Sequence, residues 1–142
     1  MSGYLPDVNV IVASVRSDHA HHASARAFLS AARDQGRVCA VPVEVLAAAL
    51  RILTLPVWQE PETSESAGEL LAGWIDAVDA EVVGHPPAAW HVLAEFARTL
   101  ALSPRSVPDA LIAASAIASR STVVTFDRGF AGYPGLRAEV LV

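Results

Sequence analysis

Short β-branched runs alternate with longer alanine- and leucine-rich segments along this chain, and this alternation limits the folds that it can adopt. The runs expected to be strands are residues 4–13, 37–41, 80–84, 121–126 and 139–142. Strands that alternate with helices form a mainly parallel sheet covered by helices on both faces. We therefore expect residues 1–142 to form a single domain, a three-layer α/β/α structure with a mainly parallel central sheet.

Helix boundaries are predicted from apolar spacing and from capping residues. Residues 43–53 carry leucines and alanines at the i, i+3, i+4 and i+7 spacing of one buried helix face. Ser17 or Asp18 is expected to cap a helix that stops at Gly36, and Ser106 is expected to cap the helix that follows it. One further helix is predicted over residues 71–78 and another after Pro87, whereas residues 54–66 are predicted to form a loop.

Composition narrows the classes of protein that fit. With 53% hydrophobic and 18% charged residues, the chain is expected to fold rather than to be disordered. A net charge of −5 argues against a protein that holds nucleic acid by positive charge alone. It does not exclude an enzyme in which carboxylates bind divalent metal, because the metal reverses the local charge. The chain contains ten arginines and no lysine, which disfavours enzyme classes that need a lysine.

The sequence also bears on location and redox state. No apolar stretch is long enough to cross a bilayer, and the start of the chain, Met1 to Tyr4, lacks the basic region of a signal peptide. A cytoplasmic location is therefore expected. The single cysteine, Cys39, lies in an apolar run and cannot form an internal disulfide, so we expect a buried, inert thiol.

One acidic residue stands where an unpaired charge would be costly. Asp7 lies within the first expected strand, among Leu5, Val8 and Val10. A buried carboxylate is strongly destabilising, or stays neutral, unless it has a partner. That partner is either structural, such as an arginine or backbone amides, or functional, and a strand-interior aspartate favours function.

Three further acids stand near strand ends or helix starts. Glu44 lies in the first turn of its helix, where the dipole favours any carboxylate. Asp109 follows Ser106 at the spacing of a capping box, and Asp127 lies in a turn after a strand, where aspartate is common. Each position therefore has a structural explanation of its own. Together with Asp7, however, these acids occupy places that converge on one edge of a parallel sheet.

Converging carboxylates imply a cation. Several of them repel strongly unless a cation lies between them, and such oxygen ligands suit Mg²⁺ or Mn²⁺. The chemistry that follows is hydrolysis of a phosphodiester by a metal-activated water. We therefore expect a metal-dependent nuclease whose catalytic acids are Asp7, Glu44, Asp109 and Asp127, with the three aspartates as metal ligands.

The chain resembles the PIN-domain ribonucleases, specifically the VapC-like toxins of bacterial toxin–antitoxin pairs. The resemblance covers nearly the whole chain and rests on four segments: LPDVNVIVA (5–13), PVEVLAAALRIL (42–53), PDALIAASA (108–116) and VVTFDRGF (123–130). The last two, at their spacing from the D-x-N of the first, are fairly specific together. The resemblance implies a PIN-like fold and an endonuclease that cleaves single-stranded RNA with Mg²⁺ or Mn²⁺. It also implies a homodimer and an antitoxin that binds the same chain and blocks the site.

The resemblance extends to single residues. The four acids match the metal-binding acids of the family, Asn9 matches the small polar residue beside the first, and Thr125 matches the hydroxyl residue before the last. Asn9 and Thr125 would orient waters or ligands. Arg128 is a candidate phosphate contact, although a surface arginine in a turn fits equally well. The second acid of the family commonly lies deeper in its helix, near 46–48, so ligation by Glu44 can be indirect.

Two other function classes stay open. A receiver or another phosphoryl-transfer module also places an aspartate at the end of its first strand. Such a module normally needs a second acid and a lysine, whereas here Asp7 stands beside Asn9 and no lysine is present. A non-catalytic module would use the acids to hold a structural ion or a basic partner.

Two groups of residues carry weaker expectations. The histidines at 19, 21 and 22 lack the spacing of a zinc site, and a solvated helix start is expected there. The apolar residues Leu55, Val57 and Trp58 either form a surface for the second subunit or the antitoxin, or pack against the core.

Overall fold

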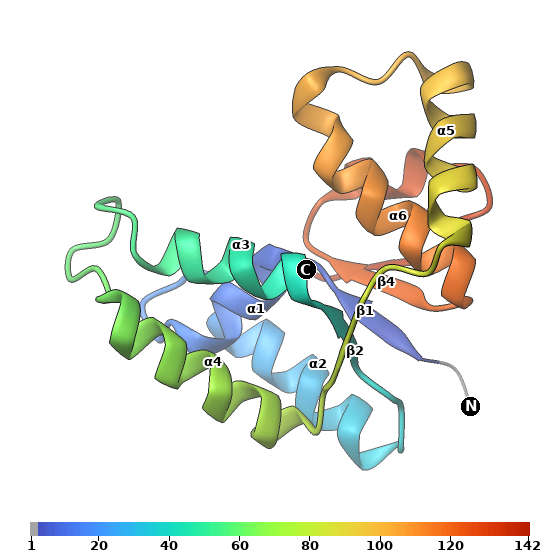
Figure 1. The fold of residues 1–142 in the computed structure, drawn as a ribbon. Helices are drawn as coiled ribbons and strands as arrows, with labels where there is room; N and C mark the ends of the chain where they lie inside the picture. Colours follow the sequence, from blue (N-terminus) through green and yellow to red (C-terminus); the bar gives the residue numbers. More distant parts are fainter. Residues whose placement is uncertain (1–2) are drawn as a thin grey trace.

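The computed structural model describes residues 3–142. Within this range the strands are β1 (Tyr4–Pro6), β2 (Ala40–Pro42), β3 (Glu81–Val83), β4 (Thr122–Thr125) and β5 (Ala138–Val140). The α-helices are α1 (Val8–Val15), α2 (His22–Asp34), α3 (Val43–Leu53), α4 (Ser64–Val78), α5 (Ala88–Leu100) and α6 (Val107–Ser119). Figure 1 shows the strands between two groups of helices, with α5 and α6 on one side and α1 to α4 on the other. This arrangement confirms the expected three-layer α/β/α fold.

The strands are parallel in every pairing found among the described residues. β1 pairs with β4, β4 with β5, and β2 with β3. A parallel bridge between Tyr4 and Cys39 joins β1 to β2, so the strands lie in the order β3-β2-β1-β4-β5. Because all of them run in one direction, their carboxyl ends lie along the same edge of the sheet, where ligands bind in folds of this class.

The first expected strand is wrong beyond its third residue. β1 ends at Pro6, and residues 8–15 form helix α1 instead of continuing the strand. The segment is apolar except for Asn9 and Ser14, and a short, mostly apolar run shows no period that separates a buried helix from a buried strand. Asp7 stands between the two elements and caps α1, so it lies at the end of β1 and not within a strand.

One predicted cap is wrong, because Asp18 pairs with Arg16 instead of capping and α2 begins only at His22. Ser106 occupies the predicted N-cap position of α6, but its side chain makes no capping hydrogen bond. The Ser103 hydroxyl accepts a hydrogen bond from the backbone nitrogen of Ser106 and caps the 3₁₀ turn Pro104–Ser106 that precedes α6. The remaining predicted helices and strands are present, most with ends shifted by a few residues, whereas the helix expected over 71–78 begins at Ser64, inside the expected loop.

The loop before α4 is anchored by a buried arginine. The Arg16 guanidinium donates to the Glu60 carbonyl oxygen at 2.9 Å and lies 4.5 Å from the centre of the Trp58 ring. The indole nitrogen of Trp58 donates to the Ile52 carbonyl at 2.9 Å. Trp58 therefore packs within its own chain, whereas Val57 is 74% exposed.

The structure tests the expectations about the cysteine and about membrane-spanning helices, and it covers only part of the segment on which the signal-peptide expectation rests. Cys39 is buried, as expected, and burial raises the pKa of its thiol to about 11, so it is protonated at neutral pH. Over the described residues, no helix has the length and apolar character needed to cross a bilayer. Met1 and Ser2, on which part of the signal-peptide prediction rests, lie outside the described residues.

Candidate metal centre

Asp7 lies at the point where the central strand β1 passes into helix α1. Its Oδ1 accepts a hydrogen bond from the backbone nitrogen of Val8 at 2.7 Å, which caps the helix. Its Oδ2 accepts from the Thr125 hydroxyl at 3.0 Å. The side chain is only 5% exposed, so the structure confirms the expected burial of this carboxylate. Both donors are uncharged groups, and no arginine is among the partners found for Asp7 in the described chain.

Thr125 holds the ends of two neighbouring strands together. It is fully buried at the end of β4, and its hydroxyl both donates to Asp7 and accepts from the backbone nitrogen of Asp127 at 2.9 Å. Asp127 in turn accepts from the backbone nitrogen of Gly129 at 2.8 Å. A Cβ on Gly129 would stand 3.0 Å from the same carboxylate oxygen, so any larger residue here would require the Asp127 carboxylate to shift. The expected orienting role of Thr125 therefore has a geometric basis.

The three aspartates act on one another electrostatically. Burial raises the pKa of Asp7 to about 6, the charges of Asp109 and Asp127 add to this, and the hydrogen bonds from Val8 and Thr125 oppose it. Burial, with the charge of Asp127, also raises the pKa of Asp109, which lies in the first turn of α6. Asp7, Asp109 and Asp127 therefore form one electrostatic group at the carboxyl edge of the sheet, as their positions in the sequence predict.

Glu44 stands apart from this group. It lies in the first turn of α3, its side chain is 62% exposed, and it is not among the charges that shift the pKa of Asp7 or Asp109. Its carboxylate instead lies 2.9 Å from Nε2 of His85. The structure thus brings three of the four predicted acids together and gives the fourth a different partner.

The donor set fits a hard divalent cation. It consists of carboxylate oxygens: the charges of Asp109 and Asp127 raise the pKa of Asp7, the charge of Asp127 raises the pKa of Asp109, and a cation between the three would relieve that repulsion. In the part of the chain that the structure describes, no three side chains of His, Cys, Asp or Glu approach closely enough to hold a metal ion. The carboxylates would therefore move toward one another as they bind such an ion.

The remaining predicted residues lie near the same edge. Asn9 is exposed in the first turn of α1, and Arg128 is exposed directly after Asp127. Two of the histidines near the start of α2 make structural contacts. The His21 ring stacks on Phe126 with ring centres 4.4 Å apart, and Nδ1 of His22 lies 2.8 Å from the Ala13 carbonyl oxygen.

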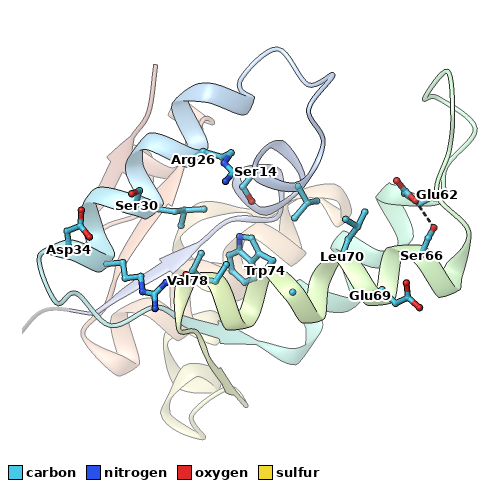
Figure 2. Close-up of a pocket in the computed structure, with 15 residues that line it drawn as sticks. Ser14, Arg26, Ser30, Asp34, Glu62, Ser66, Glu69, Leu70, Trp74 and Val78 are labelled. Atoms are coloured by element: carbon cyan, nitrogen blue, oxygen red, sulfur yellow. Dashed lines mark hydrogen bonds between the residues drawn. The ribbon is translucent and has the colours of Figure 1, made fainter.

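A separate cavity of about 810 Å³ lies between α2 and α4, away from the aspartates. Figure 2 shows Trp74 within it, and Glu62 and Asp34 toward its two ends. The residues that line it include none of the predicted site residues. The candidate centre is therefore a feature of the sheet edge and not of this cavity.

Known proteins match this chain in sequence over most of its length. The family model of the PIN domain matches residues 4–136. The chain belongs to the PIN-domain family. Ribonuclease VapC43 of Mycobacterium tuberculosis is 29% identical over 132 residues, which cover 92% of this chain and 90% of that protein. Ribonuclease VapC25 of the same organism is 29% identical over 139 residues and covers 94% of this chain and 95% of its own. The resemblance seen in the sequence is confirmed.

Solved structures share the fold of this PIN domain. VapBC2 from Rickettsia felis, solved bound to a DNA fragment from its promoter, has a TM-score of 0.78 at 21% identity and covers 98% of each chain. VapC20 of Mycobacterium tuberculosis, described as a toxin that cleaves the sarcin–ricin loop, has a TM-score of 0.68 at 16% identity. The match covers 95% of this chain and 99% of that one.

Three residues near the acids of this PIN domain were not predicted. Tyr133 lies close enough that the charges of Asp109 and Asp127, together with burial as the larger cause, raise its pKa. His85 contacts Glu44 and also forms a hydrogen bond with Ser115. Nothing in the sequence around Tyr133 or Ser115 signals a role, whereas His85 follows a predicted strand at the edge that carries the acids.

Thr125→Val should destabilise this PIN domain. The substitution removes the buried hydroxyl and leaves the Asp127 nitrogen without its acceptor, so the free energy of unfolding should fall by about 1–3 kcal/mol. Urea denaturation measures this. Thr125→Ser, which keeps the hydroxyl, is the matched control. Equal stability of the valine and serine variants would contradict the role given to the hydroxyl.

Proposed function

We propose that this PIN domain is an endoribonuclease that uses Mg²⁺ or Mn²⁺ to cleave single-stranded RNA and acts as the toxin of a toxin–antitoxin pair. The observation that carries the proposal is the electrostatic group of Asp7, Asp109 and Asp127 at the carboxyl edge of a parallel sheet. The VapC ribonucleases to which the chain is similar support the reaction class.

Each acid has a distinct role in this proposal. Asp7, Asp109 and Asp127 are the ligands of the metal, directly or through waters, and Glu44 completes the shell from the neighbouring strand end. A metal held by these residues would supply an activated water and would stabilise charge on the phosphate. Thr125 keeps Asp7 and the backbone of Asp127 in register, because its hydroxyl contacts both. Asn9 orients water, and the exposed Arg128 contacts the phosphate of the substrate.

The proposed partners follow from the relatives. The solved structures with this fold include VapBC complexes from Rickettsia felis and Salmonella typhimurium, both bound to DNA. By analogy with these complexes, we propose that this chain forms a homodimer and binds an antitoxin that covers the carboxylate edge. We also propose a cytoplasmic location, because an RNA substrate and an antitoxin of this kind would be met there.

Metal removal tests the proposed reaction. Single-stranded RNA incubated with the purified chain should be cut in the presence of Mg²⁺ or Mn²⁺, remain intact in EDTA, and be cut again when metal is added in excess. A duplex of the same sequence and a single-stranded DNA of the same sequence are the substrate controls. Cleavage that EDTA leaves unchanged would reject the metal mechanism, and metal binding without cleavage would favour a non-catalytic module.

A further inference from the structure

His85 links the predicted acid Glu44 to the interior of the protein. It lies in the segment between β3 and α5, and its side chain is 15% exposed. Nδ1 forms a hydrogen bond with the hydroxyl of Ser115, a buried residue of α6, and Nε2 lies 2.9 Å from the Glu44 carboxylate. One imidazole thus connects the start of α3 with the middle of α6.

The two contacts of the ring are chemically complementary. A serine hydroxyl that donates to Nδ1 leaves the proton of a neutral imidazole on Nε2, the nitrogen that faces the carboxylate. Nε2 is buried, and although the pair lies within ion-pair distance, the ring is not aligned for a linear hydrogen bond. Because the Glu44 carboxylate can only accept, it favours the proton on Nε2, and the Ser115 hydroxyl then donates to Nδ1 and holds the ring from the other side.

The pair lies on the same sheet edge as the three aspartates. Asp7 directly follows β1, Glu44 lies two residues beyond β2, and His85 lies two residues beyond β3. These three strands are neighbours, so their ends are adjacent. The Glu44 side chain is exposed and has several rotatable bonds, and ordering such a side chain costs conformational entropy. A mostly buried imidazole that is held by Ser115 reduces that cost.

We propose that His85, oriented by Ser115, is a positioning residue that holds the Glu44 carboxylate at the rim of the metal centre. The proposal rests on the proposed function, since it needs a metal at Asp7, Asp109 and Asp127. It also explains how Glu44, which stands apart from the three aspartates, can contribute to the metal centre: the contact with His85 keeps its carboxylate at the same edge of the sheet.

A double-mutant cycle on metal binding tests this link. Glu44→Gln and His85→Ala should each weaken Mn²⁺ binding about tenfold, measured by calorimetry on the purified chain. The double variant should bind no more weakly than Glu44→Gln alone, because His85 acts through Glu44. His85→Gln, whose amide nitrogen can stand where Nε2 stands, should restore most of the affinity. His91→Ala, at an exposed position on α5, is the matched control and should change nothing.

A second readout needs no metal and no activity. In ¹⁵N NMR spectra of the metal-free protein, His85 should show the tautomer with its proton on Nε2. Ser115→Ala should mix the two tautomers and weaken Mn²⁺ binding by a smaller factor than His85→Ala. Both variants should remain folded, which thermal unfolding checks. A packing role alone would leave the tautomer and the Mn²⁺ affinity unchanged in Ser115→Ala.

Three outcomes would overturn the proposal. The losses in the double variant could multiply, which would show that His85 and Glu44 act independently. Mn²⁺ affinity could stay unchanged in His85→Ala while it falls in Glu44→Gln, or it could stay unchanged in both. These results are distinct from failure of the proposed function, which is marked by full cleavage activity in Asp7→Asn.

Discussion

Asp7→Asn should lower the rate of RNA cleavage about a thousand-fold, which corresponds to about 4 kcal/mol of transition-state stabilisation. Asparagine has the shape of aspartate and can still accept the hydrogen bond from Val8, so the cap of α1 survives. What is lost is the negative charge that would bind the metal. The loss should therefore appear in catalysis and in Mn²⁺ affinity and not in folding.

The experiment needs a control for charge and one for folding. Asp76→Asn changes an exposed aspartate on α4 by the same chemistry and should cut RNA at the normal rate. Circular dichroism and urea denaturation should show that Asp7→Asn is folded. In cells, expression of the normal chain without its antitoxin should arrest growth, and Asp7→Asn should relieve the arrest. Undiminished cleavage by folded Asp7→Asn would reject Asp7 as a ligand.

The metal-free protein should lose stability as the pH rises from about 4 to about 6. Burial, as the larger cause, and the charges of Asp109 and Asp127 raise the pKa of Asp7 from 3.8 to about 6 in the folded state. Below the lower value Asp7 is protonated in both states and contributes nothing. Between the two values the unfolded chain releases a proton that the folded chain retains, so unfolding is favoured by up to about 3 kcal/mol. Above about pH 6 the loss is complete.

Asp7→Asn isolates this contribution from that of the other acids. Urea denaturation in EDTA at a series of pH values gives the free energy of unfolding of both proteins. Relative to Asp7→Asn, the free energy of unfolding of the normal chain should fall across this pH window and then stay constant. Mn²⁺ should restore stability at the upper end, because it binds the ionised carboxylate. A difference that stays constant with pH would show that Asp7 is not held in a charge-destabilising site.

The order of elements was predictable because most segments carry their own period or caps. Residues 43–53 have one apolar face and form α3 with the predicted bounds. Residues 8–15 could not be predicted in this way, because a mostly apolar segment shows no clear apolar face and its β-branched residues favour a strand. The helix there depends on Asp7, whose side chain caps it, and on the burial of residues 10–14.

The candidate site was predictable to the extent that strand ends determine it. Asp7, Asp109 and Asp127 follow from the rule that parallel strands end at one edge, even though Asp7 was first placed inside a strand. The partner of Glu44 could not be predicted, because His85 and Ser115 are brought to it by the packing of α6 against α5, which no local pattern encodes. Likewise, the link from Thr125 to Asp7 spans 118 residues and depends on the pairing of β1 with β4.

That pairing also determines when the candidate centre can form during synthesis. β1 leaves the ribosome before β4, because Asp7 precedes Thr125 by 118 residues in the chain. The hydroxyl of Thr125 reaches Asp7 only after the two strands meet. A nascent chain therefore carries Asp7 without Asp109 and Asp127 until the segments that hold those two aspartates have been made. We therefore expect the proposed nuclease to stay inactive until β4 has been made and has paired with β1.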